Sequence, residues 1–384
     1  MEAKTGTSYW HMKTMEASGT KFKSGQKWKL LPWILSFFSL LLAATLCEWR
    51  GDAWEKKIRY GFYNAFLDSF PDFAPNFVDD RGIPVTYYPI QNGISAGYRY
   101  NGTIVAKYAI EYYQRLQQDP ADSVRRRYFD NCVHWLDSAI TEVNGHALYV
   151  FDWQQPWYVK VGKPFTCGMT SGRAIEVFTD AFELDGDSNH LKQAARLVRG
   201  YALPVEEGGY TYKNQEGWWY EEIADTGMQT PRILDGHIFA LTGLHKYFLL
   251  TRDTLAKEYF DLGIMSLKAA LPRYDRGDGF VYYDAIGKLA DENYHPLLVS
   301  QMDELWKMTG DPVFQTYYLK WGKPLWRPYV VRAFINRNKS AALLIGILSI
   351  LFFLLLYSGF RIIAQSKNNN HSDILISKKK HSVY

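Results

Sequence analysis

One hydrophobic stretch, residues 341–359, limits what this chain can fold into more than any other feature. It contains no charged residue, and it is close to the roughly 20 apolar residues that a helix needs to cross a bilayer. A second hydrophobic stretch covers residues 30–47. It follows a leader that is long for a signal peptide and has no clear cleavage site, although a cleaved signal peptide is the alternative. We therefore predict a transmembrane signal anchor over 30–47 and a transmembrane helix over 341–359.

The excess of positive charge lies at the two ends of the chain. Residues 1–29 hold six lysines against two acidic residues, and residues 358–384 hold five lysines and arginines against one acidic residue. Because basic residues are enriched on the cytosolic side of membrane spans, we expect basic cytosolic tails over 1–29 and 360–384 and an extracytosolic domain over 48–340. The tails do not indicate nucleic-acid binding, since the body between them is acidic overall.

The protein is therefore expected to be a multi-pass membrane protein. Its body would lie in the Golgi lumen of a eukaryote, or outside the cell or in the periplasm of a prokaryote. The triplet Asn101-Gly102-Thr103 fits this location because it is an acceptor pattern for N-glycosylation. Cys132 and Cys167 are candidates for one disulfide bond there. The sequence leaves that bond open, and it also leaves open whether the protein forms a homodimer.

A short polar turn containing Asp recurs between apolar helical segments, at Asp119, Asp187, Asp253 and Asp311. Each Asp is expected to cap the helix that follows it by accepting backbone N–H groups. The spacing of about 60–70 residues suits a repeated helical hairpin with a long loop. We predict a mostly α fold, an α/α toroid or incomplete α/α barrel of paired helices, with small β-hairpins at the cleft rim near 208–212 and 278–284. A linear helical solenoid is the alternative, but its shorter period fits poorly.

The densest loop of this body is Trp218-Trp219-Tyr220-Glu221-Glu222, and a helix is expected after it over 231–250. A carboxylate among large aromatic side chains loses part of its hydration, which raises its pKa. A carboxylate with a raised pKa is a stronger base, and this suits it to removing a proton from a substrate. Taken alone, such a pair of glutamates is more often an ordinary polar rim.

The order and spacing of several segments resemble the C-terminal domain of D-glucuronyl C5-epimerases, over residues 83–322. The matching segments are Tyr88-Pro89-Ile90-Gln91, Met169-Thr170-Ser171-Gly172-Arg173, Trp219-Tyr220-Glu221-Glu222, Ile233-Leu234-Asp235-Gly236-His237, Ser266-Leu267-Lys268-Ala269-Ala270-Leu271-Pro272, Tyr274-Asp275, Tyr282, Tyr294-His295 and Gln301. The resemblance implies an α/α-toroid isomerase that inverts C5 of glucuronate within heparan-type chains, giving iduronate. A uronic-acid polysaccharide is then the expected substrate.

Inversion at C5 requires the removal of a weakly acidic proton from one face of the sugar and the return of a proton to the other. The resemblance implies Glu222 and Tyr294 as catalytic residues, with Tyr282 as a further catalytic tyrosine. This scheme requires no metal and no cofactor. A tyrosine has an ordinary pKa of about 10, so it acts readily as an acid.

The resemblance also indicates which side chains would contact the substrate. They are Tyr88, Gln91, Arg173, Trp219, Tyr220, Glu221 and His295. Arg232 and Lys268 are further candidates for holding the substrate carboxylate, and a packed structural role is the alternative for His295. Tyr88 and Gln91 are expected in a segment that leads into a helix.

The chain departs from the family pattern at two places near the expected site. Ile223 and Ala224 replace the Tyr and Pro that usually follow the glutamate pair, and residues 285–287 replace an Arg-His of the rim loop. We also expect no counterpart of the N-terminal β-rich portion of the animal enzymes. These losses keep two alternatives open: a polysaccharide lyase, which expels the 4-linked sugar after the same proton abstraction, and a non-catalytic, membrane-tethered glycan-binding protein.

Overall fold

The computed structural model describes residues 24–66, 76–158, 160–227, 230–291, 293–335 and 339–380. The chain divides into two compact units. We call Lys57–Arg327 the body, and we call Met1–Lys56 together with Pro328–Tyr384 the terminal unit.

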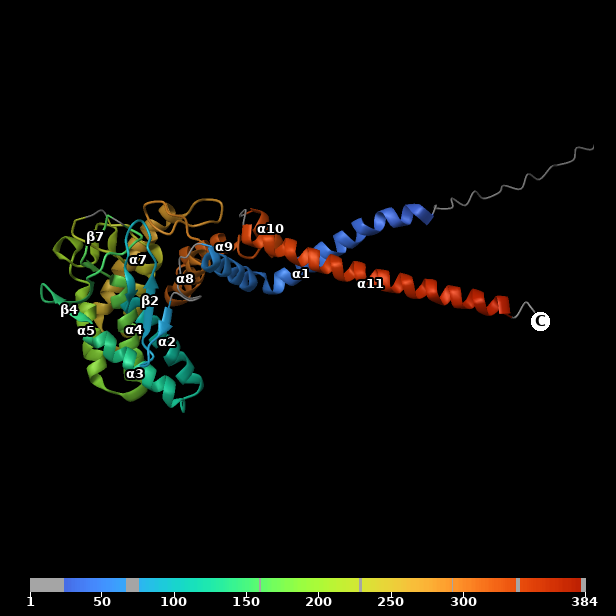
Figure 1. Cartoon of the computed structure of the whole chain (residues 1–384). Helices are drawn as coiled ribbons and strands as arrows, with labels where there is room; N and C mark the ends of the chain where they lie inside the picture. The colour runs from blue at the N-terminus through green and yellow to red at the C-terminus, as the bar shows by residue number, and fades with distance from the viewer. Residues whose placement is uncertain are drawn as a thin grey trace, which may run out of the picture. The chain divides into compact units, whose positions relative to one another are not determined.

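Four helical hairpins follow one another along the body (Figure 1, teal to orange). They are α2 (Gly102–Gln118) with α3 (Ser123–Ser138), α4 (Gly168–Asp185) with α5 (Ser188–Gly200), α6 (Leu234–Thr251) with α7 (Thr254–Tyr274), and α8 (Tyr294–Thr309) with α9 (Pro312–Gly322). The first helix of each hairpin packs against the first helix of the next, so α2, α4, α6 and α8 form an inner layer. This arrangement confirms the predicted incomplete α/α toroid.

The inner helices run in the same direction, because their N-terminal ends contact one another. The Thr103 hydroxyl at the start of α2 is 2.6 Å from the Thr170 hydroxyl at the start of α4. The N–H of Gly168, the first residue of α4, donates to the carbonyl of Glu221 at 2.8 Å. The Glu222 side chain in turn packs on Gly236, in the first turn of α6. One end of the inner layer thus collects four helix N-termini and the loops before them.

Small antiparallel sheets lie before the first hairpin and in the loops between later hairpins. They are β1 (Asn76–Val78), β2 (Pro84–Tyr88) and β3 (Gly97–Arg99); β4 (Ile140–Val143), β5 (His146–Phe151) and β6 (Phe165–Thr166); and β7 (Thr211–Asn214) with β8 (Gly217–Tyr220), preceded by a 3-10 turn at Val205–Glu207. Tyr88 ends strand β2, and strand β3 follows it before helix α2 begins, so the segment of Tyr88 and Gln91 reaches a helix only after a second strand. A β-hairpin forms close to residues 208–212, and single bridges join Asp275 to Val281 and Tyr282 to Leu289.

Three of the four predicted aspartate caps are confirmed. Asp187, Asp253 and Asp311 each accept a backbone N–H two residues ahead and precede α5, α7 and α9. Asp119 instead ends α2, and Asp122 caps α3 by accepting the Arg125 N–H at 2.9 Å. The cap falls on Asp122 because a capping side chain reaches only the first turn of the helix that begins directly after it.

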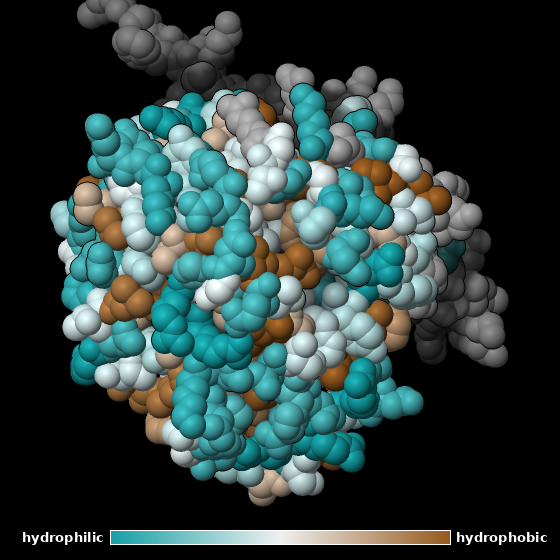
Figure 2. Space-filling view, turned by 90° about the vertical axis from the view of Figure 1, so that its left-hand side faces the viewer, coloured by the Kyte–Doolittle hydropathy of each residue, from teal (hydrophilic) through white to brown (hydrophobic). Residues whose placement is uncertain are grey.

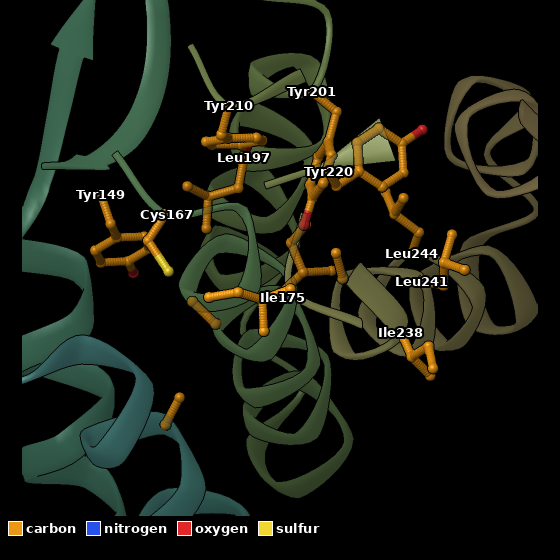
Figure 3. Packing of buried hydrophobic residues seen from close by; sticks show 14 of the residues in the cluster. Tyr149, Cys167, Ile175, Leu197, Tyr201, Tyr210, Tyr220, Ile238, Leu241 and Leu244 are labelled. Carbon is orange, nitrogen blue, oxygen red and sulfur yellow. The ribbon is translucent and has the colours of Figure 1, made fainter. Parts of the chain in front are cut away.

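Large aromatic side chains fill the space where α4, α5, α6 and the β7–β8 hairpin meet (Figure 3). Tyr201, Tyr210 and Tyr220 are fully buried, and the Tyr201 ring packs edge-on against the other two. The Tyr201 hydroxyl donates to the Gly168 carbonyl at 2.8 Å, which ties this core to the start of α4. The core therefore supports the end of the inner layer where the helix N-termini meet.

Helices α4 and α6 approach each other most closely at Gly172 and Gly243. A Cβ on Gly243 would lie 1.9 Å from the Gly172 carbonyl oxygen. We expect Gly243→Ala to lower the free energy of unfolding by about 3 kcal/mol, because the backbones would have to move apart. Thermal unfolding in detergent measures this, with Gly346→Ala as the control, since a Cβ there meets nothing within 4 Å. A Gly243→Ala protein as stable as the control would contradict the close packing.

The terminal unit holds the two long apolar helices and one short helix. Helix α1 (Ser24–Phe66) begins in this unit, which also contains α10 (Tyr329–Ile335) and α11 (Lys339–Lys380). Leu30–Glu55 and Lys339–Ser366 are long and apolar enough to cross a membrane. The predicted spans 30–47 and 341–359 lie within them. Of the two basic tails, residues 1–23 and 381–384 lie outside the described residues, and the orientation across a membrane stays a prediction.

Polar contacts join α10 to α1 at the C-terminal end of the stretch Leu30–Glu55. The Tyr329 hydroxyl donates to Glu55 at 3.2 Å, and Arg332 pairs with Asp52 at 2.9 Å.

The surface of the body is mostly hydrophilic on the face that holds β4, α5 and β7, at the left of Figure 1. Hydrophobic residues form only small separate groups on this face (Figure 2).

The structure decides the disulfide bond that the sequence left open. Cys47, Cys132 and Cys167 are all free and buried, so the candidate Cys132–Cys167 bond is not formed. The two side chains have separate partners: the Cys132 thiol points at the Gly82 carbonyl at 3.9 Å, and the Cys167 sulfur accepts the Thr170 N–H at 3.3 Å as the cap of α4.

Candidate active site

Glu222 is the second residue after strand β8 and reaches the N-terminal end of the inner helices. Its side chain packs so tightly on α6 that a Cβ on Gly236 would lie 2.6 Å from its Oε2 atom, so this close approach requires glycine. Oε2 is buried and has no hydrogen-bond partner among the described residues. Burial, and then the negative charge of Asp235, raise the pKa of Glu222 well above its ordinary value, while Lys288 opposes the rise. Glu222 therefore holds its proton tightly and is a strong base once the proton is lost.

Asp235 is the second carboxylate of the site. It lies in the first turn of α6, is 2% exposed, and its Oδ1 atom has no hydrogen-bond partner among the described residues. Burial raises its pKa to about 7, although hydrogen bonds from the helix backbone and from Tyr283 oppose the rise. Because Glu222 and Asp235 repel each other when both are ionised, they titrate as a pair.

Two tyrosines border this carboxylate pair. Tyr294 begins α8 and is 36% exposed, whereas Tyr283 is buried; their ring centres are 4.5 Å apart. The Tyr283 hydroxyl interacts with the Asp235 carboxylate and with the Tyr294 hydroxyl. Burial, followed by the charges of Asp235 and Glu222, raises the pKa of Tyr294 above its usual value, so its phenol stays protonated. We call Glu222, Asp235, Tyr283 and Tyr294 the acid–tyrosine cluster.

Tyr88 approaches the cluster from the end of β2. Its hydroxyl accepts the Asn101 side-chain N–H at 2.7 Å, and its ring lies 4.8 Å from that of Trp153. Burial raises the pKa of Tyr88 to about 12, and Glu222 adds to the rise. Asn101, the first residue of the glycosylation triplet, caps α2 by accepting the Thr103 N–H at 2.9 Å. The Asn101 side-chain amide is thus already hydrogen-bonded both to Tyr88 and to the first turn of α2.

The rim loop at 284–290 closes one side of the cluster. Tyr158 lies in the loop that precedes β6, and its hydroxyl donates to Asp284 of the rim loop at 2.6 Å. The Lys288 ammonium group lies over the Tyr283 ring, 4.9 Å from its centre. Burial raises the pKa of Tyr158 above its usual value, and Asp284, Glu222 and Asp235 contribute. These rim residues were not identified from the sequence.

Of the predicted site residues, Trp219 and Tyr220 belong to the core. The Trp219 ring stacks on His237 at 4.1 Å between ring centres, and the Tyr220 N–H donates to His237 Nδ1 at 3.0 Å. His237 Nε2 donates to the Gly263 carbonyl at 3.1 Å, and burial lowers the pKa of His237 to about 3. His237 is therefore neutral and fixes the strand that leads to Glu222.

Glu221 and His295 also bind within the protein. Glu221 is fully buried, one of its oxygens accepts the Arg232 N–H at 3.1 Å, and burial raises its pKa to about 8. His295 Nε2 donates to the Trp321 carbonyl at 3.0 Å, and burial lowers the pKa of His295. Neither contact involves the acid–tyrosine cluster, so their role in substrate binding stays a prediction.

The remaining predicted residues have no contact with the acid–tyrosine cluster among the described interactions. Arg173 pairs with Glu176 at 2.9 Å and Lys268 pairs with Asp311, while Gln91 is exposed. Tyr282 lies next to Tyr283 in the chain, and its catalytic role stays a prediction. Neighbouring residues of an extended segment point to opposite sides, so Tyr283 faces Tyr294 although the resemblance implied Tyr282.

The site can hold an anion and move protons. The N-terminal ends of the inner helices carry the positive ends of the helix dipoles, which favour negative charge. The carboxylate pair supplies a base, and the protonated phenols supply acids. Within the described ranges, no cluster of three or more His, Cys, Asp and Glu side chains is arranged to hold a metal ion.

Comparison with known proteins agrees with the sequence resemblance. Residues 143–323 match the family described as "D-glucuronyl C5-epimerase C-terminus". The chain is 29% identical over 171 residues to the D-glucuronyl C5-epimerase of Caenorhabditis elegans, covering 40% of this chain and 27% of that enzyme. It is 28% identical over 275 residues to an uncharacterized protein of Methanocaldococcus jannaschii, covering 67% of this chain and 88% of the relative.

Solved structures show more distant likeness. A sugar epimerase from a ruminal bacterium has a TM-score of 0.46 at 11% identity, with 71% of this chain and 74% of that chain covered. A family 76 α-mannanase of Bacteroides thetaiotaomicron has a TM-score of 0.43 at 15% identity, with 76% and 72% covered. Likeness at this level carries no information about substrate or reaction.

Proposed function

We propose that this protein is a carbohydrate epimerase, because residues 143–323 match the family described as "D-glucuronyl C5-epimerase C-terminus". The reaction we propose is inversion of C5 in a uronic-acid residue of a polysaccharide, from D-glucuronate to L-iduronate. The acid–tyrosine cluster carries the proposal: a buried carboxylate pair lies beside protonated phenols where four helix N-termini meet. The matched region is a small part of the worm enzyme, so the substrate rests on this site rather than on that relative.

In the first step, the ionised Glu222 carboxylate takes the C5 proton of the sugar. The electron pair of the broken C–H bond moves toward the sugar carboxyl group, whose oxygens gain negative charge. Nearby donors and dipoles must stabilise that charge for the step to proceed. Burial of Glu222 supports its role as base, because a carboxylate that has lost its hydration accepts a proton more readily.

In the second step, the Tyr294 hydroxyl gives its proton to the opposite face of C5, and the charge returns from the carboxyl oxygens to form the new C–H bond. Tyr294 is partly exposed, so its phenolate regains a proton from solvent. Glu222 keeps the abstracted proton until it exchanges. The reverse reaction uses the two residues in exchanged roles.

The two membrane-spanning candidates support a membrane-bound enzyme. We propose that the body lies outside the cytosol, in the Golgi lumen or its prokaryotic equivalent, where a growing polysaccharide would meet it. The basic tails would then remain in the cytosol, in keeping with the positive-inside tendency. On intact Golgi vesicles, whose cytosolic face points outward, a membrane-impermeant reagent should label a tag at either end of the chain, and protection of either tag would contradict this topology.

Deuterium exchange tests the proposed reaction. The detergent-solubilised protein is incubated in heavy water with glucuronate-containing polysaccharides, and deuterium at C5 and the ratio of glucuronate to iduronate are followed by NMR. We expect both incorporation and inversion. Formation of an unsaturated uronate would indicate the lyase alternative, and binding without exchange on any glycan would favour the glycan-binding alternative.

The pH dependence follows from the coupled carboxylates. The base must be ionised, so kcat/KM should rise with pH as the Glu222–Asp235 pair loses its proton, near pH 7 or above. Asp235→Asn removes the negative charge that raises the pKa of Glu222, so the rising limb should move to lower pH. The pH profile of C5 exchange, measured for the unchanged protein and for Asp235→Asn, locates the rising limb of each. A rising limb at the same pH in both proteins would show that the two carboxylates do not titrate together.

A further inference from the structure

Lys288 is the cation that faces the buried carboxylates. Its ammonium group lies 4.9 Å from the centre of the Tyr283 ring and 5.9 Å from that of Tyr158. Its positive charge acts on both Glu222 and Asp235. Cation–π contacts with these two rings hold the ammonium group at the edge of the site, and the Lys288 side chain remains exposed to solvent.

The loop that carries Lys288 is fixed by one buried side chain. Asp284 is 2% exposed, and its Oδ1 atom accepts the backbone N–H groups of Ile286 and Lys288, each at 3.0 Å. Its Oδ2 atom accepts the Tyr158 hydroxyl at 2.6 Å. Lys288 is thus positioned from the opposite loop as well as from its own.

Several other cations of the body are already paired with carboxylates. Arg173 binds Glu176, and the further pairs are Lys246 with Asp180, Lys268 with Asp311 and Lys320 with Asp275. Lys288 forms no ion pair with any residue that the structure describes. Its charge is therefore available to a ligand, whereas two of the cations predicted from the sequence, Arg173 and Lys268, are paired with carboxylates.

A sugar carboxylate that enters this site meets two acidic groups that repel it when they are ionised. A free ammonium group beside them offsets that repulsion, and it does so more strongly as charge builds on the carboxyl oxygens during proton removal. We propose that Lys288 binds the C6 carboxylate of the substrate and selects uronates over neutral hexoses. This inference rests on the proposed epimerase function and adds the residue that recognises the substrate class.

The test compares Lys288→Met, Lys288→Arg and the control Lys107→Met, an exposed lysine on α2, with the unchanged protein. The ligands are a glucuronate–N-acetylhexosamine oligosaccharide and its carboxyl-reduced, neutral counterpart. Calorimetry measures binding of both, and C5 deuterium exchange measures turnover of the first. Thermal unfolding verifies that each variant is folded.

Lys288→Met should raise KM about tenfold and lower kcat/KM about 100-fold, since it removes a charge interaction that strengthens in the transition state. Its preference for the carboxylate ligand over the neutral one should disappear, whereas Lys288→Arg should keep most of it. Tyr158→Phe, which frees the loop but keeps the charge, should raise KM with the preference retained. A folded Lys288→Met protein with unchanged KM and unchanged preference would overturn the inference.

Failure of the proposed reaction gives a different result. If the unchanged protein shows no C5 exchange but binds the carboxylate ligand more tightly than the neutral one, and Lys288→Met loses this difference, the reaction is wrong and the recognition by Lys288 stands. If the unchanged protein binds both ligands equally, the recognition by Lys288 is overturned, whatever the exchange experiment shows.

Discussion

Replacing Glu222 with Gln is expected to abolish C5 deuterium exchange, with a loss of about four orders of magnitude, at the upper end of what one acid–base group contributes. Gln has almost the same shape as a protonated Glu, and Glu222 holds its proton tightly at neutral pH. The variant should therefore fold and bind substrate normally while lacking the base. Exchange rates and calorimetric affinity, measured on the same preparation, separate these two properties.

Glu216→Gln is the matched control for this experiment. Glu216 is exposed and lies in the turn of the hairpin whose second strand leads to Glu222. It should retain the exchange rate of the unchanged protein. Glu222→Gln with a normal exchange rate would show that another group removes the proton, and Asp235 would then be the first residue to examine.

Replacing Tyr294 with Phe should remove inversion but not every form of exchange. The loss of the phenolic proton donor is expected to slow the conversion of glucuronate to iduronate about 1,000-fold. Glu222 remains and can return a proton to the face from which it was taken. One of the two epimers should therefore still take up deuterium at C5 with its configuration retained, and NMR of the reisolated glycan distinguishes retention from inversion.

Tyr108→Phe, a half-buried tyrosine on α2, is the control for loss of a phenol elsewhere. It should invert C5 at the normal rate. If Tyr294→Phe also inverted C5 normally, the acid would have to be another tyrosine. Tyr283, which contacts both Tyr294 and Asp235, and Tyr282, which the family resemblance implies, could then be compared as Phe variants.

The candidate site was partly predictable from the sequence. Glu222 and Tyr294 could be named because the order of motifs resembled a known family, and the structure places both at the same end of the inner helices. Asp235 lies within one of those motifs, but the sequence does not single it out, because an Asp at the start of a helix is favoured there by the helix dipole alone. Lys288 had no signal at all: its role depends on Asp284 and Tyr158, which are far apart in the chain.

The sequence by itself determined the two apolar spans, the mostly helical body and three of its four aspartate caps. These features depend on local hydrophobicity, helical periodicity and capping chemistry, which act over a few neighbouring residues. Only the tertiary structure decided that Trp219 and Tyr220 are buried on His237, that Cys132 and Cys167 stay apart, and that Asp235 and Lys288 face Glu222. Those outcomes depend on which side of a strand or helix turn each residue occupies once distant segments pack together, and no local pattern contains that information.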